Sequence, residues 1–241
     1  MRQIRLYTPQ QLEAGSVIEL DPHAAHHLGK VLRASAGDPV TLFNGEGLDW
    51  VCSVDRIEKK SLWVSVLKAQ DAIAEAPIDT HLGLCLSKGD RFDWAIQKAT
   101  ELGVTEITPL FSERVDVKLP SDRLDKRLAQ WRRIVIGACE QCGRARIPEI
   151  HPPKHLGAWV ASAESALKWV LDHQTSTAWP EAAPSSIDLL IGPEGGLTEQ
   201  EIALATTAGF QGLRLGPRVL RTETAPAVAL GIMGSRWGDV N

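Results

Sequence analysis

Two patterns of hydrophobic and polar residues divide the chain. Before residue 72, short runs with apolar residues near every second position predict β-strands. Gly, Asp and Asn, which are typical of turns, separate these runs. The runs read SVIEL, DPVTLFNG, DWVCSVDRIE and SLWVSVLKA. One helix, expected from His23 to Arg33, interrupts them, and together they predict a small β-barrel. The segment QDAIAEAP, which ends at Pro77, is expected to be a linker.

From His81 onward, strand-like and helix-like segments alternate. The expected strands read HLGLCLS, VTEITPLF, LKWVLD, IDLLIG and GLRLG. A helix is predicted after Asp90, its possible N-cap, with Gly103 just past its end. A longer amphipathic helix is predicted from Ser121 to Gly143, and HQTSTAWPEAAPSS, from His173, is expected to be a loop. This alternation predicts an α/β fold with a mainly parallel sheet covered on both faces.

Composition excludes several classes of protein. The chain has 241 residues, is 44% hydrophobic and carries a net charge of −4, which predicts packed domains and argues against a generic nucleic-acid coat. Four cysteines in a chain of this length do not indicate a disulfide scaffold. No apolar run approaches a membrane span, and a soluble, cytoplasmic protein is expected. Basic residues outnumber acidic ones in residues 86–146 and 211–241, which fits either an RNA-binding face or ordinary surface scatter.

The loop IGPEGGLTEQEI follows an expected strand and precedes a helix that should begin near Thr198, because Thr198 and Glu201 have capping-box spacing. Ligands of α/β sheets bind beside such loops. Gly192, Gly195 and Gly196 permit close approach of the backbone to a ligand. Phosphate is disfavoured, because the loop lacks the P-loop Lys and contains Glu194. A plain glycine-rich turn is the alternative.

The loop LGPRVLRTETA repeats this design and adds two arginines, Arg218 and Arg221, three positions apart. Arginines in a loop punctuated by Gly and Pro suit bidentate recognition of phosphate or carbonyl groups. The alternative is a pair of surface charges beside a helix. An apolar, small-residue run, Ala225 to Gly234, follows and predicts the last helix.

Metal chemistry is not expected from the cysteines. Cys139 and Cys142 form a C-x-x-C motif in a helix-like run, but no second C-x-x-C motif or paired histidines complete a zinc site. His26, Lys30 and Arg33 lie along the predicted N-terminal helix. These three side chains form either an RNA-facing surface or a solvated helix face.

Four separated segments together resemble the ribosomal RNA small subunit methyltransferase E family, within the SPOUT superfamily. These segments are KGDRFDWAIQKATELGV, ACEQCGR, IGPEGGLTEQEI and LGPRVLRTETA. The resemblance implies an N-terminal PUA-like RNA-binding β-barrel in residues 1–72. It also implies a SPOUT methyltransferase domain with a deep trefoil knot in residues 73–241. It further implies S-adenosylmethionine (SAM) as cofactor, a homodimer, and 16S rRNA, within a small-subunit particle, as substrate.

Site residues follow from the loops and the resemblance together. The expected cofactor-binding residues are Gly192, Glu194, Gly195, Gly196, Leu215, Gly216 and Leu220. The resemblance also implies that the methyl group is added to N3 of a uridine in this rRNA. Arg218, Arg221 and Glu223 are expected to act on that uridine. RNA contacts are expected from Arg5, His26, Lys30, Arg33, Lys88, Arg91 and Arg144, and no metal ligand is expected. A non-catalytic RNA-binding protein, a methyltransferase with another RNA target, and a nucleotide-phosphate-binding enzyme are the alternatives.

Overall fold

The computed structural model describes residues 4–59, 61–117, 119–172 and 177–240, and of Ser121 only the backbone. The chain divides into two compact units. The N-terminal unit comprises Met1–Ala74 and Cys139–Ile147, and the C-terminal unit comprises Glu75–Ala138 and Pro148–Asn241. The sequence pattern does not predict the return of residues 139–147 to the N-terminal unit.

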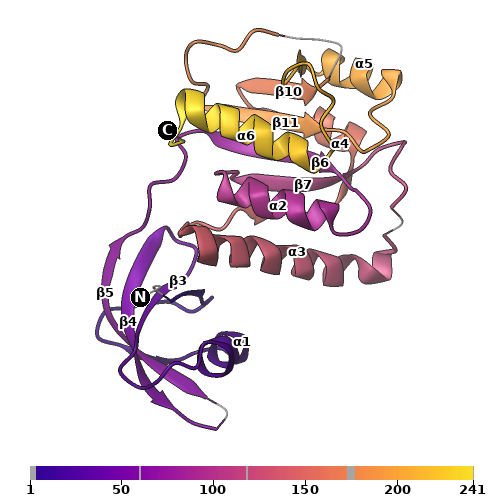
Figure 1. Ribbon diagram of the computed structural model, residues 1–241. Coiled ribbons are helices and arrows are strands. Elements are labelled where there is room, and N and C mark those ends of the chain that lie inside the picture. Colours follow the sequence, from indigo (N-terminus) through magenta and orange to yellow (C-terminus); the bar gives the residue numbers. More distant parts are fainter. Residues whose placement is uncertain (1–3, 60, 118, 173–176, 241) are drawn as a thin grey trace. The chain divides into compact units, whose positions relative to one another are not determined.

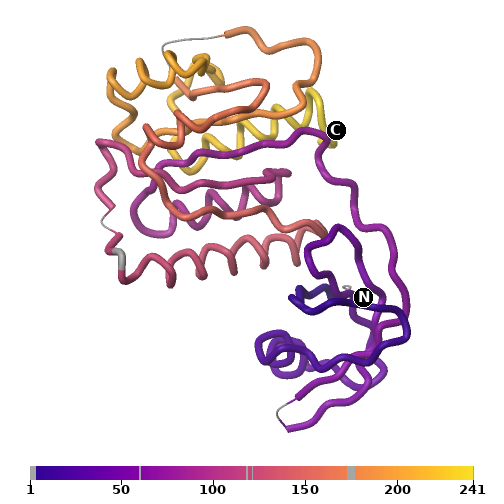
Figure 2. Tube along the Cα trace, turned by 180° about the vertical axis from the view of Figure 1, so that it is seen from behind, coloured from indigo at the N-terminus to yellow at the C-terminus, as the bar shows by residue number. Residues whose placement is uncertain are grey.

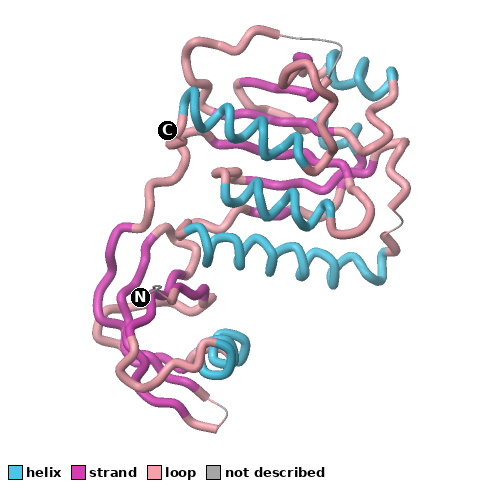
Figure 3. The backbone as a smooth tube through the Cα atoms, viewed as in Figure 1, coloured by secondary structure: helices cyan, strands magenta, loops and turns pink. Residues whose placement is uncertain are grey.

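The N-terminal unit contains a five-stranded sheet in the order β1-β3-β4-β5-β2. Its strands are β1 (Arg5–Tyr7), β2 (Val17–Glu19), β3 (Pro39–Phe43), β4 (Leu48–Ile57) and β5 (Leu62–Asp71). Leu62, Val64 and Val66 of β5 are buried at alternate positions, as expected for a strand with one face on a core. Strand predominates in this part of the chain (Figure 3). Among the described residues, the outer strands β1 and β2 are not paired with each other, so the hydrogen bonds do not close this sheet into a barrel.

The helix expected from His23 to Arg33 differs in the structure. An α-helix, α1 (Pro22–His26), passes directly into a π-helical turn, η1 (His27–Val31). The Asp21 carboxylate accepts hydrogen bonds from the amides of His23 and Ala24 and so begins α1. Arg33 then has a φ of +55°, a left-handed conformation that ends the helical segment.

The C-terminal unit contains a seven-stranded sheet in the order β12-β10-β11-β6-β7-β8, with β9 also paired to β7. All of these pairs are parallel, which confirms the predicted α/β class. Its strands are β6 (Asp79–Cys85), β7 (Glu106–Phe111), β8 (Glu149–Ile150), β9 (Lys154–His155), β10 (Leu167–Leu171), β11 (Ser186–Ile191) and β12 (Gln211–Leu213). Ile187 to Ile191 of β11 are buried consecutively, because helices cover both faces of the sheet.

Helices connect these strands and form the outer layers. They are α2 (Arg91–Glu101), α3 (Ser121–Cys142), α4 (Leu156–Ala161), α5 (Glu199–Thr207) and α6 (Thr224–Trp237). In Figure 1, α2 and α6 lie side by side in front of the sheet, and Figure 2 shows the same layers from behind. Gly103 has a φ of +90° directly after α2, so the predicted helix end is confirmed.

Large aromatic side chains fill the interior of the C-terminal unit. Trp159 of α4 packs so closely on β6 that a Cβ at Gly83 would lie 2.6 Å from its ring. Trp169 of β10 stacks on Trp237 at the end of α6, with ring centroids 6.0 Å apart, and so holds that helix against the sheet. None of the described helices has the length and apolar character that a membrane span requires.

Candidate functional site

A cavity of about 570 Å³ lies within the C-terminal unit, where the predicted loops follow β11 and β12. This volume is in the range of small-molecule sites. All seven of the predicted cofactor-binding residues line the cavity, namely Gly192, Glu194, Gly195, Gly196, Leu215, Gly216 and Leu220. The two glycine-containing loops therefore form one concave surface, although 18 residues lie between Gly196 and Leu215.

The first loop is held in place by the helix that follows it. The Thr198 hydroxyl accepts a hydrogen bond from the Glu201 amide at 3.2 Å, and the Glu201 carboxylate accepts one from the Thr198 amide at 2.8 Å. The predicted capping box is thus confirmed. Gly196 has a φ of +70°, a conformation that favours glycine and turns its backbone toward the helix.

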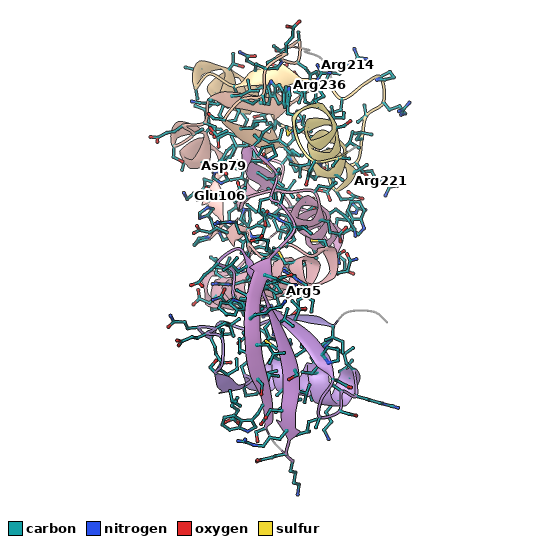
Figure 4. The ribbon with its side chains drawn as sticks, turned by 90° about the vertical axis from the view of Figure 1, so that its left-hand side faces the viewer. Arg5, Asp79, Glu106, Arg214, Arg221 and Arg236 are labelled. Carbon is teal, nitrogen blue, oxygen red and sulfur yellow. The ribbon has the colours of Figure 1, made fainter. Side chains whose placement is uncertain are left out.

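Of the three residues of the second loop that are predicted to act on the substrate, only one lines the cavity. Arg218 lines the cavity, as do Leu220 and Thr222, but Arg221 and Glu223 are not among its lining residues. Arg221 is exposed and extends away from the ribbon (Figure 4). Gly216 has a φ of +116°, so this position also requires glycine.

Arg91 connects the two loops through their carboxylates. Its guanidinium, at the start of α2, donates a hydrogen bond to Glu194 at 3.0 Å and lies 4.0 Å from Glu223. The Glu223 side chain is only 15% exposed, and its Oε2 atom has no hydrogen-bond partner within the described part of the chain. The pairing gives Arg91 a role inside the protein, in addition to the RNA contact predicted for it.

Sequence reasoning missed Arg114 and Asp172, which line the cavity, and a second contact of Glu201. Arg114, after β7, lines the cavity and donates a hydrogen bond to the Gly195 carbonyl at 2.9 Å. Glu201 accepts a further hydrogen bond from the Glu113 amide at 2.9 Å, which joins this segment to α5. Asp172, directly after β10, also lines the cavity. The sequence could have predicted this position, because Asp172 directly follows an expected strand and the carboxyl ends of adjacent parallel strands lie at the same end of a sheet.

Comparisons with known proteins give the family. A model described as an RNA methyltransferase domain matches residues 74–234, and one described as an RNA methyltransferase PUA domain matches residues 20–67. The ribosomal RNA small subunit methyltransferase E of Buchnera aphidicola from Schizaphis graminum is 34% identical over 240 residues, which cover 98% of each chain. That of Bacillus subtilis is 30% identical, over 92% of this chain and 91% of its own. The chain belongs to the ribosomal RNA small subunit methyltransferase E family.

Solved structures agree with this membership of the methyltransferase E family. A ribosomal RNA small subunit methyltransferase E from Neisseria gonorrhoeae, bound to S-adenosyl methionine, superposes with a TM-score of 0.93 at 37% identity and covers both chains completely. A Legionella pneumophila protein, solved with bound SAM, has a TM-score of 0.95 at 42% identity, over 99% of this chain and 100% of its own. The PUA match confirms the predicted class of the N-terminal part.

The predicted RNA-contacting residues of this family member divide into exposed and internal ones. His26, Lys30 and Arg33 are exposed on the α1–η1 segment. Arg5 is instead an internal group: it pairs with Asp49 at 2.8 Å and donates to the carbonyls of Cys139 and Arg144.

Two of the residues predicted to contact RNA, Arg5 and Arg144, have little exposed surface. The Arg5 guanidinium also lies over the Phe43 ring, 3.9 Å from its centroid, so its contacts are made within the protein. Arg144 is only 4% exposed and has little surface to offer to RNA. Lys88 is exposed and paired with Asp116 at 2.8 Å, and surface pairs of this kind are weak enough to open for a phosphate.

The four cysteines, all described, form no disulfide. Burial raises the pKa of the Cys52 thiol to about 11. Burial also raises that of Cys85 to about 12. Cys139 is fully buried in α3, whereas Cys142 is half-buried. Cys142 is the only one of the four thiols that is not buried, so it alone is accessible to a reagent in the folded protein.

Brief treatment of the native protein with iodoacetamide at pH 7.5 should therefore add one group, at Cys142. In urea, all four thiols should react. Intact-mass measurement followed by peptide mapping checks both results. Labelling of Cys85 as fast as that of Cys142 in the native protein would contradict this account of burial.

Proposed function

We propose that this chain transfers the methyl group of SAM to N3 of a specific uridine of 16S rRNA, in the decoding region of the small subunit. Family membership supports the class of enzyme. The observation that carries the proposal is the cavity formed jointly by the two glycine-containing loops. The predicted trefoil knot, which would hold these loops together, is part of this proposal.

The residues around the cavity fit SAM better than a nucleotide triphosphate. SAM carries a sulfonium cation, an adenine and an amino-acid tail, but no phosphate. Among the described residues the lining holds three carboxylates (Asp172, Glu194, Glu199), three guanidinium groups (Arg114, Arg214, Arg218) and no lysine. Glu194, inside the first loop, suits the sulfonium of SAM and would repel a phosphate there. Backbone groups from Gly192 to Gly196 and from Leu215 to Leu220 would hold the adenine and ribose.

Replacing Gly216 with Ala should weaken SAM binding about tenfold or more, because the φ of +116° strains any side chain by roughly 1–3 kcal/mol. Nothing lies within 4 Å of the added Cβ, so packing should be unaffected. Gly15→Ala is the matched control, since Gly15 has a φ of +86°, equally open surroundings and no place in the cavity. Titration calorimetry measures both. Equal SAM affinity in the two variants would remove Gly216 from the cofactor site.

Methyl transfer to uridine requires removal of the N3 proton. When bound, SAM supplies the electrophilic methyl group. The N3–H bond must break and its proton must pass to a base, so that the nitrogen lone pair can accept the methyl group; the carbon–sulfur bond of SAM would break in that transfer, with its electron pair staying on sulfur. Negative charge develops on the uracil ring during this step, and a nearby guanidinium stabilises it. Because Arg218 lines the cavity and Arg221 does not, Arg218 is the better candidate for this guanidinium.

Glu223 is the candidate for the base. Its buried Oε2 has no described partner, so the carboxylate retains an acceptor site. Its neighbours Thr222 and Ala225 line the cavity, which places the backbone of residue 223 at the cavity's edge. Arg91 lies at the other oxygen of Glu223 and orients the carboxylate. Arg91 is thus a positioning residue in this mechanism.

Glu223→Gln should lower the single-turnover methylation rate about 10²- to 10⁴-fold at pH 7, the range for loss of a general base. The defect should shrink as pH rises, because solvent then removes more of the N3 proton. Rates are measured across a pH series with SAM saturating and a small-subunit particle as substrate. A loss that does not vary with pH assigns Glu223 a structural role only.

Glu194→Gln is the matched variant for that experiment. Glu194 shares Arg91 with Glu223 but lies in the other loop. Its replacement should change SAM affinity, and any change in rate should be independent of pH. Absence of methyl transfer by the unmodified protein would favour the alternative of a non-catalytic RNA-binding protein. Transfer to a different RNA would favour a related methyltransferase with another target.

The exposed cations of the α1–η1 segment are proposed to contact RNA phosphates. The double variant Lys30→Gln, Arg33→Asn should lower the slope of log affinity against log salt by roughly 1.4–1.8, since each lost contact removes about 0.7–0.9. Asn is chosen because it tolerates the left-handed conformation of Arg33. Lys59→Gln with Lys68→Gln, two exposed lysines of the same unit, is the control for charge alone. Identical slopes for both pairs would show that the segment is not the RNA face.

Assembly and location complete the proposal. A homodimer that uses α6 is proposed from the family resemblance and from the small residues Ala225, Ala227, Ala229, Gly231 and Gly234. An rRNA substrate implies work in the cytoplasm.

A further inference from the structure

The register of the parallel sheet aligns five ionisable residues in one row across five strands. Lys168 pairs with Asp188, Asp188 with His81, His81 with Glu106, and Glu106 with Glu149. Residues in register on neighbouring strands share a face of the sheet. The row crosses the amino-terminal half of β11 and β6, whereas the proposed cofactor cavity follows the carboxyl ends of the strands. Methyl transfer therefore gives this row no role.

Three side chains converge at one end of the row. His81 (β6), Glu106 (β7) and His151, which follows β8, offer ligand atoms that all lie within 4.8 Å of one another. His151 Nε2 lies 2.8 Å from Glu106 Oε2, and His81 Nδ1 lies 3.9 Å from the same oxygen. Ligand atoms around a tetrahedral zinc ion are about 3.3 Å apart, given bonds of about 2.0–2.2 Å. The two distances to Glu106 Oε2 are each within roughly half an ångström of this value, and side-chain rotation would bring the remaining ligand atoms to it.

Oxygen acceptors face the remaining nitrogen of each imidazole. Thr108 Oγ1 lies 2.8 Å from His81 Nε2, and Glu149 Oε1 lies 3.4 Å from His151 Nδ1. Histidines bound to metals usually donate their other N–H to such an oxygen, which fixes the ring. The His81 and His151 side chains are 24% and 22% exposed, so water can complete the coordination.

Buried charge beside the cluster also favours a cation. The Asp188 side chain is 3% exposed, and its Oδ1 lies 3.5 Å from His81 Nδ1. A carboxylate buried to this extent is stabilised by a cation nearby.

Trp159 opposes metal binding in a way that can be tested. Its indole N–H can only donate, and it lies 3.1 Å from His81 Nε2. This contact selects the tautomer of His81 with the proton on Nδ1. Binding of an ion at Nδ1 moves that proton to Nε2, where Thr108 accepts it, and the indole loses its acceptor.

We propose that His81, Glu106 and His151 bind a divalent transition-metal ion, with zinc the best match to two imidazoles and one carboxylate. The ion joins β6, β7 and the segment after β8 at the end of the sheet away from the cavity. In Figure 4, Glu106 and Arg221 lie on opposite sides of the C-terminal unit. The ion's role is therefore structural.

The test is calorimetric titration of zinc chloride into the full-length protein after removal of metal with EDTA. A Cys142→Ser background prevents uptake by the half-buried thiol. We expect one ion per chain with a dissociation constant in the micromolar range or below. His151→Ala and Glu106→Gln should each weaken binding about tenfold or more. His155→Ala is the matched control, because His155 is exposed, lies on β9 and is outside the cluster, and it should bind zinc normally.

Two further measurements keep the outcome decisive. Cobalt(II) should give visible absorption bands of tetrahedral coordination that His151→Ala abolishes. Trp159→Phe, which removes the competing N–H, should bind zinc more tightly than the parent protein, provided that circular dichroism shows a native fold. Failure to take up zinc at tens of micromolar would overturn the proposal, as would uptake that His151→Ala and Glu106→Gln leave unchanged.

Discussion

The parallel arrangement of the C-terminal sheet is the constraint on which the rest of this unit depends. Every strand pair in this sheet is parallel, so all loops that leave the carboxyl ends of the strands lie at the same end of the sheet. The two glycine-containing loops, Asp172 and Arg114 meet there only for this reason. The same geometry separates the amino-terminal ends of the strands from the cavity. A unit of this kind therefore has two ends with different chemistry: backbone-rich loops at one, and ionisable side chains of the strands at the other.

Charge balance between the loops depends on Arg91. Glu194 and Glu223 belong to different loops, and without a cation between them the two carboxylates would repel each other. The Arg91–Glu194 contact is 46% and 37% exposed, so its contribution to stability is small. Its geometric effect is larger, because one planar guanidinium fixes the direction of two side chains. The start of α2 is thus part of the site, although no residue of that helix lines the cavity among those described.

Local patterns predicted much of the fold and located the two loops that line the cavity. Alternating apolar residues located β5, and the spacing of Thr198 and Glu201 located the start of α5, because both signals lie within a few residues. The environment of Arg5 was not predictable in this way. Its partners Asp49 and Cys139 are 44 and 134 residues distant, and a lone arginine near the N-terminus gives no sign of burial. A helix was correctly predicted near residues 23–33, but its change from α-helical to π-helical hydrogen bonding at His27 was not.

The charged row across the sheet was also not predictable from the sequence, because it depends on the register of the strands. The strands are mostly apolar with one or two ionisable residues each, and such a residue alone suggests only a strand end exposed to water. Register turns five separate ionisable residues into neighbours. Burial of Asp188 and partial burial of His81 are costly unless their partners are present, and a slip of one residue in any strand would separate them. The row therefore specifies the register of β10, β11, β6, β7 and β8 more strictly than apolar contacts can, since a slipped apolar strand still finds apolar neighbours.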